Sequence, residues 1–170
     1  MCKRIPAATR SLITQEKRRL VLTEVPTEMF PGVTVTGTIP RAYNTEHSNR
    51  DYYLDAEGTA PDPFTDEQVV IIDTVAGTVV LVGCSHAGLM NIMEYVADLT
   101  GHRRIHAILG GLHMADADAD TMDNVLDILF EFNVQMLGLS HCTGADAKAL
   151  FRTKFFRKCI EMPVGSRIRI

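Results

Sequence analysis

Hydrophobic residues in the second half of the chain alternate between two periods, one typical of buried strands and one typical of helices. A continuous apolar run, as expected of a strand buried on both faces, occupies residues 79–82, and mainly apolar segments that also predict strands occupy residues 105–109 and 134–139. After each run, apolar positions recur at three- and four-residue steps, which predicts amphipathic helices over residues 89–99, 121–132 and 145–156. The pattern therefore predicts an α/β fold that ends in three consecutive strand–helix units.

Shorter apolar segments precede these units and predict further strands. Residues 69–74 lead through Ala76 and Gly77 into residues 78–82, which predicts an antiparallel hairpin. Residues 33–39 alternate apolar with hydroxyl side chains, as a half-buried strand does, with Gly37 as a candidate bulge. The remaining expectations are short strands at 20–22 and 168–170, a loop between Pro26 and Gly32, a ragged segment at 1–20, and a long loop at 41–65.

The composition is that of one ordinary globular domain of 170 residues, with 46% hydrophobic and 22% charged residues. A net charge of −4 gives no reason to expect a nucleic acid or an anionic membrane as a partner. No apolar run reaches the roughly 18 residues of a membrane span, and no apolar segment follows the basic N-terminus as in a signal peptide. The four cysteines form no CxxC pair, so we expect reduced thiols and a cytoplasmic protein.

A histidine follows each of the three predicted strands of the strand–helix units. His86 lies in the sequence GCSHAG, His113 in GGLHM and His141 in SHCTG, one strand–helix unit apart from each other. Ligands of layered α/β proteins bind beyond the carboxyl ends of the strands, and neutral imidazole is the commonest transition-metal ligand. We therefore predict a metal site with His86 and His141 as ligands. His113 is the catalytic candidate: it can be a ligand, a general acid, or a donor to a substrate oxyanion.

Other polar residues near these motifs leave alternatives open. Cys84 and Cys142 flank the histidines and can be thiolate ligands, small buried hydrophobes, or the nucleophile of a Cys–His pair. Thr143 opens a predicted helix N-terminus that can hold a phosphate or a carboxylate. The aspartates at 116–123 suit a capped helix start better than a calcium loop, which requires a glycine and a terminal glutamate. We interpret His47, His102 and His106 as structural or exposed.

The three histidine motifs, together with Gly37–Arg41 and Pro61–Gln68, resemble a branch of the metallo-β-lactamase-fold superfamily. That branch comprises metallo-hydrolases similar to 7,8-dihydropterin-6-methyl-4-(β-D-ribofuranosyl)aminobenzene-5′-phosphate synthase, and the resemblance runs from about Leu20 to the C-terminus. It implies a four-layer αββα sandwich with one or two divalent metal ions, zinc or else iron or manganese. In that fold His86 and His141 fall on metal positions of the second half. His113 stands where many relatives carry an acidic ligand.

The sequence departs from this family in one respect, because it contains no HxHxDH motif. In the family that motif lies in the first half and supplies most of the metal ligands. We therefore expect residues 1–170 to be a single partial domain, the C-terminal portion of such a sandwich. A complementary N-terminal half or a second copy of the chain would then complete the site.

The resulting hypothesis is a hydrolase in which a metal-bound hydroxide attacks an ester or phosphoester-like small molecule. Arg41, Asp66 and Thr143 are the candidate substrate-binding residues. The alternative is a non-catalytic split or degenerate half-domain that binds a partner subunit. A third hypothesis is a thiol enzyme that uses a Cys–His pair, which alkylation would inactivate and chelators would not.

Overall fold

The computed structural model describes residues 7–15, 20–43 and 52–170. Within them a seven-stranded sheet is ordered as the strands occur in the chain. The strands are β1 (Thr27–Phe30), β2 (Val33–Val35), β3 (Val70–Thr74), β4 (Gly77–Leu81), β5 (Ile105–Gly110), β6 (Met136–Leu139) and β7 (Cys159–Glu161). The α-helices are α1 (Ala7–Gln15), α2 (Leu89–Thr100), α3 (Ala119–Glu131) and α4 (Ala145–Phe155). None of these helices is long and apolar enough to cross a membrane.

The sheet has an antiparallel half and a parallel half, which meet at strand β4. Strands β1 to β4 pair antiparallel, whereas β4, β5, β6 and β7 pair parallel. Each parallel neighbour is reached through a helix, as this connection requires. The predicted hairpin and the three predicted strand–helix units are therefore confirmed, and the fold class is mixed α/β.

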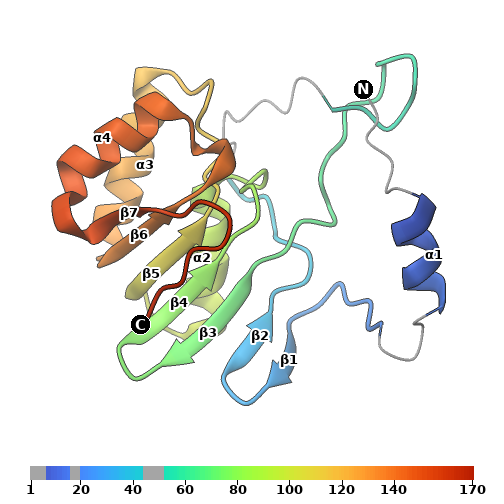
Figure 1. The fold of residues 1–170 in the computed structure, drawn as a ribbon, viewed down its shortest axis with the longest axis horizontal. Coiled ribbons are helices and arrows are strands. Elements are labelled where there is room, and N and C mark those ends of the chain that lie inside the picture. Colours follow the sequence, from blue (N-terminus) through green and yellow to red (C-terminus); the bar gives the residue numbers. More distant parts are fainter. Residues whose placement is uncertain (1–6, 16–19, 44–51) are drawn as a thin grey trace.

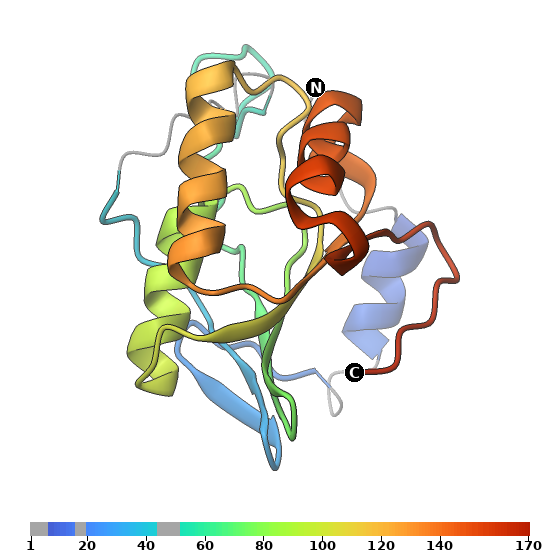
Figure 2. The ribbon, with the colours of Figure 1, turned by 90° about the vertical axis from the view of Figure 1, so that its left-hand side faces the viewer.

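Helices α2, α3 and α4 cover one face of the sheet (Figure 1, Figure 2). Side chains of a strand alternate between faces, so every second strand residue enters this core. Val80, Ile108 and Leu137 belong to it and are at most 1% exposed. The apolar stripes of the helices meet them through fully buried residues such as Ile92, Leu129 and Phe151. This layer holds the carboxyl ends of β4, β5 and β6 in place.

The opposite face of the sheet is apolar too and is covered by the end of the chain. Val79, Ala107 and Leu109 point to this side and are buried, with Met162 and Ile168 packed against them. Figure 1 shows the last residues running back in front of the sheet toward β4. The segment at 168–170, predicted as a strand, instead packs through a side chain without joining the sheet. The closing strand is β7, too short for an alternation to mark it in the sequence.

The first strand of the structure lies several residues after the position that we predicted for it. Residues 20–22 form no strand and are exposed, whereas β1 lies at Thr27–Phe30, in the predicted loop. The turn at Pro31–Gly32, where Gly32 has φ 75°, folds β1 back onto β2 as a hairpin. The partner of β2 is thus the segment next to it in the chain, β1, and not the more apolar segment at 20–22. Helix α1 lies within the stretch that we predicted to be ragged.

The predicted strand at 33–39 ends early, at Val35. Thr36 still donates its N–H to Val69, but Thr38 donates to Glu24 instead of continuing along β3. Gly37 makes this change of partner possible, because its φ is 66° and a Cβ there would lie 2.4 Å from the backbone of Glu24. Gly37 is thus a crossing point between two chain segments, where we had expected a bulge.

Candidate functional site

The loops after β4, β5 and β6 lie side by side at one edge of the sheet, and backbone hydrogen bonds connect them. Gly111 donates its N–H to Gly83 over 3.0 Å, which joins the first loop to the second. Met114 donates to Cys142 over 3.1 Å, which joins the second to the third. The buried Ser85 hydroxyl adds a bond of 2.8 Å to the Gly111 carbonyl. These loops carry His86, His113 and His141, so the predicted gathering of the three histidine motifs at one edge is observed.

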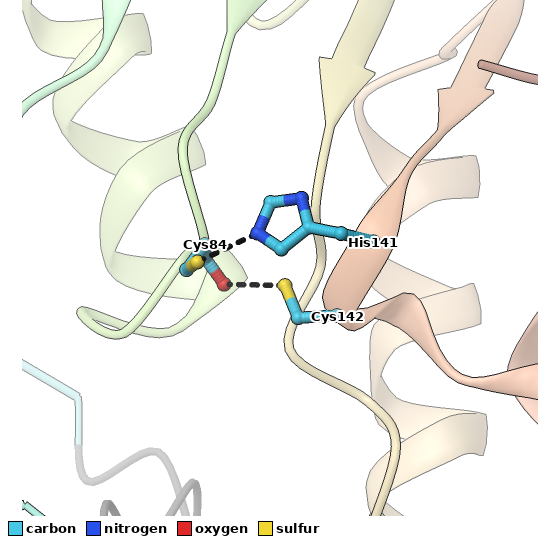
Figure 3. A group of neighbouring side chains, drawn as sticks. All are labelled: Cys84, His141 and Cys142. Carbon is cyan, nitrogen blue, oxygen red and sulfur yellow. Dashed lines mark hydrogen bonds between the residues drawn. The ribbon is translucent and has the colours of Figure 1, made fainter. Parts of the chain in front are cut away.

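Two cysteines and one histidine form the first group of side chains at this edge, here called the thiol cluster (Cys84, His141 and Cys142). The Cys84 Sγ lies 2.8 Å from the His141 Nε2, and the Cys142 thiol donates to the Cys84 carbonyl over 3.6 Å (Figure 3). The His113 backbone N–H in turn points to the Cys142 Sγ at 3.3 Å. The Sγ and imidazole nitrogen atoms all lie within 4.8 Å of one another.

Gly111 makes room for this cluster. A Cβ at this position would lie 2.4 Å from the Cys142 Sγ and 2.9 Å from both the His141 Cε1 and the Gly83 carbonyl oxygen. Real side chains do not tolerate such distances, so the sulfur and the imidazole occupy space that any larger residue would fill. The second glycine of the GGLHM motif thus has a steric reason in the geometry of the cluster.

The second group, here called the aromatic cluster, comprises Tyr52, Phe64, His86 and His113. The Phe64 ring stacks on His86 with centroids 4.0 Å apart and planes 6° from parallel. Tyr52 meets the same imidazole edge-on at 5.7 Å, and the His113 ring lies 4.3 Å away, tilted by 49°. His86 is consequently only 8% exposed. The long loop before β3 thus forms one wall of the site.

A glutamate that the sequence analysis did not select fixes the backbone beneath His86. The Glu67 carboxylate accepts the N–H of His86 at 2.7 Å and that of Ala87 at 2.5 Å. Asp66, which we predicted to line the site, is exposed and borders a different surface cavity together with Leu22 and Thr38. Arg41 lies next to the His86 loop and donates to the carbonyl oxygens of His86 (3.1 Å) and Phe64 (3.3 Å).

Comparison with known proteins finds two curated proteins and a solved structure that are similar to this chain, although no protein-family model matches it. It is 27% identical over 155 residues to 7,8-dihydropterin-6-methyl-4-(β-D-ribofuranosyl)-aminobenzene-5′-phosphate synthase of Methanocaldococcus jannaschii, covering 89% of this chain and 53% of that protein. An uncharacterized protein of the same organism is 26% identical over 156 residues (91% and 56%). The crystal structure of Tm1679, a metal-dependent hydrolase of the β-lactamase superfamily, superposes with a TM-score of 0.73 at 26% identity, covering 88% of this chain and 57% of that one.

In sequence and in fold the chain is similar to a metal-dependent hydrolase of the β-lactamase superfamily. The resemblance that the histidine motifs suggested is thereby confirmed, and so is the fold class. The chain spans about half the length of the curated relatives it matches. In this chain, a Cys/His group that could hold a metal ion lies beside two further histidines at the sheet edge.

The protonation states of two side chains bear on what this site can do. Burial, together with the neighbouring Cys142 and Glu67, raises the pKa of the Cys84 thiol to about 11. A thiol with that pKa is protonated at neutral pH, which disfavours Cys84 as a nucleophile of the Cys–His type. Burial also lowers the pKa of the half-buried His113 imidazole, against the opposing effect of Glu67 and Asp116. His113 is therefore neutral at pH 7, the form that binds metals.

The remaining predicted residues lie at some distance from this chemistry or inside the core. Thr143 is fully buried, and its hydroxyl accepts the Leu112 N–H at 3.2 Å. His102 and His106 border a cavity near the β3–β4 turn, consistent with the structural or exposed role we predicted. Asp118 caps α3 through the Thr121 N–H, so this aspartate serves as a helix cap. His47 lies outside the described residues.

Proposed function

We propose that this chain supplies the histidine-bearing part of a metal-dependent hydrolase site that acts on a small ester or phosphoester. The observation that carries the proposal is that the three histidine-bearing loops lie together at one sheet edge. The ring centroids of His86 and His113 are 4.3 Å apart there. Single histidines often satisfy a turn. Three from consecutive strand–helix units at one strand edge are better explained as a shared site.

The donor groups of this edge are of the types that bind a transition-metal ion. His86 and His141 would hold it, and His113, neutral at pH 7, would either bind it or polarise the substrate. The His141 imidazole packs against Gly111 so closely that a Cβ at this position would collide with the ring. A divalent ion would supply Lewis acidity and lower the pKa of a water molecule that it binds.

The other residues of the edge would orient these groups and attract the substrate. Glu67 fixes the backbone of His86, while Phe64 and Tyr52 cover its ring and exclude water from that side. Arg41 is exposed and brings a positive charge next to the His86 loop, where it would attract an anionic phosphoester. Asp66 and Thr143 contribute less in this arrangement, since one lines another cavity and the other is buried.

Additional ligands would come from polypeptide that carries the first half of the sandwich, or from a second copy of this chain. Catalytic zinc usually has three protein ligands, and HxHxDH, which supplies most of them in the family, is absent from this sequence. The second candidate function, a non-catalytic module that binds such a partner, predicts the association but no metal. The relative from M. jannaschii is named a synthase, so bond formation in the same site is the competing chemistry.

The metal content of the purified chain tests the proposal. After loading with Zn²⁺ and desalting, elemental analysis should find close to one ion per chain. His86→Ala and His141→Ala should each weaken binding by more than the roughly 10–100-fold that loss of an outer-shell contact costs. His102→Ala, which alters a histidine away from the edge, is the matched control. A chain that retains no ion, or retains it equally in all variants, would exclude the metal site and favour the partner-binding module.

A further inference from the structure

We propose that the thiol cluster binds a thiophilic divalent ion through Cys84, His141 and Cys142. The inference rests on the proposed function in one respect, because His141 serves both. It differs in assigning two sulfur atoms as ligands, whereas the proposed function uses imidazoles alone. The motif residues Cys84 and Cys142 thereby receive a function that the histidine site leaves open.

The distances within the cluster are close to those between the ligands of a bound zinc ion. In tetrahedral coordination, zinc–sulfur and zinc–nitrogen bond lengths place sulfur and nitrogen about 3.6 Å apart and two sulfurs about 3.8 Å apart. All three ligand atoms already lie within 4.8 Å of one another, and the Cys84 Sγ and His141 Nε2 are 2.8 Å apart. An ion would need to separate that pair by less than about 1 Å. Rotation of two side chains accomplishes this without moving a strand.

Neighbouring groups orient each ligand toward the shared centre. The Ser140 hydroxyl lies 3.1 Å from the His141 Nδ1, which leaves the Nε2 for the cluster. The His113 N–H points to the Cys142 sulfur, and Cys84 stands directly before the left-handed Ser85 (φ 63°), whose hydroxyl is bonded to Gly111. Such outer-shell contacts are what hold ligands in metal sites.

The ligand types determine which ions fit. Two thiolates and one imidazole select Zn²⁺, Cd²⁺ and Co²⁺ over the hard ions Mg²⁺ and Mn²⁺, which prefer oxygen. Three protein ligands also leave a fourth position open to water or substrate, as in catalytic zinc sites. The cysteines therefore predict an ion preference that a site made of histidine and carboxylate would not show.

Cobalt absorption tests the assignment, because only a thiolate ligand gives Co²⁺ an intense near-ultraviolet charge-transfer band. The chain would be titrated with CoCl₂ under reducing, oxygen-free conditions. Wild type should develop the band, and Cys84→Ser and Cys142→Ser should each lose it and bind Co²⁺ at least roughly tenfold more weakly. Cys159→Ser is the matched control, since this cysteine lies on β7 outside the cluster.

The His86→Ala variant separates this inference from the proposed function. A band that persists in His86→Ala and disappears in the cysteine variants supports the thiol site, whatever becomes of the histidine site. Metal binding that needs His86 but is unchanged by both serine substitutions overturns the thiol site and leaves the proposed function standing. Absence of the band in the wild type also overturns it.

Alkylation of the wild-type chain covers the case in which a serine variant fails to fold. Zn²⁺ should protect Cys84 and Cys142 from iodoacetamide, measured by peptide mass spectrometry, while Cys159 reacts at an unchanged rate. Equal reaction of all three with and without Zn²⁺ contradicts the proposal.

Discussion

The thiol cluster and the aromatic cluster stand at the same sheet edge but hold their histidines in different ways. His141 is exposed, and its Nε2 lies 2.8 Å from a thiol. His86 is 8% exposed, with its ring against Phe64 and its backbone bonded to Glu67. Equivalent strand ends can thus place one histidine beside thiol groups and another against aromatic rings that cover it. The surroundings of each histidine, and hence its chemistry, therefore depend more on how its loop packs than on which strand the loop follows.

The largest expected effect comes from filling the space beneath the thiol cluster. Gly111→Ala would press a methyl group against the Cys142 sulfur and the His141 ring. We expect it to abolish detectable Co²⁺ binding by the cluster and to lower the free energy of unfolding by about 3 kcal/mol, the upper end of overpacking costs. Co²⁺ titration and urea denaturation measure the two effects.

Gly83→Ala is the matched control for that substitution. It adds the same methyl group one strand away, where nothing lies within 4 Å of the new Cβ. Gly83→Ala should therefore leave both binding and stability close to wild type. If the two alanine variants behaved alike, the close packing of the thiol cluster around Gly111 would be refuted.

The sequence predicted which histidines gather at this sheet edge, but it did not predict how their neighbours contact them. Histidine after each strand predicted the gathering of His86, His113 and His141, because parallel strands end at one edge. Contact between Cys84 and His141 depends on how far each loop projects beyond its strand, which no residue pattern records. Likewise, Glu67 was missed in favour of Asp66, because in an irregular loop neighbouring side chains point in directions that only the backbone dihedral angles determine.

The same distinction applies to the fold. Long helices with apolar stripes and the Ala76–Gly77 hairpin were predicted from local spacing, which is enough to define them. Strand β7 has three residues and owes its place to pairing with β6, so it carries no alternation of its own. Leu20–Leu22 is apolar yet exposed, because β2 pairs with the hairpin strand adjacent in the chain.

A smaller effect is expected on the aromatic cluster when Glu67 loses its charge. Glu67→Gln keeps the shape but presents an amide N–H to one of the two backbone N–H groups it now binds, those of His86 and Ala87. Losing one charge-assisted bond should lower the free energy of unfolding by about 2 kcal/mol. It should also weaken metal binding that depends on His86, while the cobalt–thiolate band remains.

Asp66→Asn provides the comparison for Glu67→Gln, since it makes the same chemical change at the preceding, exposed residue. Urea denaturation of both variants, followed by Co²⁺ titration, would sharpen the contrast between the clusters. Loss of the thiolate band in Glu67→Gln would show that the two clusters form one coupled unit, whereas equal destabilisation by both substitutions would show that the Glu67 carboxylate does not hold the backbone of His86.

The smallest effect is expected from removing the ring that covers His86. Phe64→Ala eliminates a stacked contact at 4.0 Å, a kind of pair that contributes about 0.5–1.5 kcal/mol beyond its area burial. Phe64→Leu retains apolar cover without the aromatic face, so the difference between the two variants in urea denaturation separates burial from stacking. If stacking orients the imidazole, both variants should weaken His86-dependent metal binding. If burial alone matters, only the alanine variant should. A Phe64→Ala chain that matches wild type in stability and binding would mean that Glu67 and Arg41 suffice to position His86.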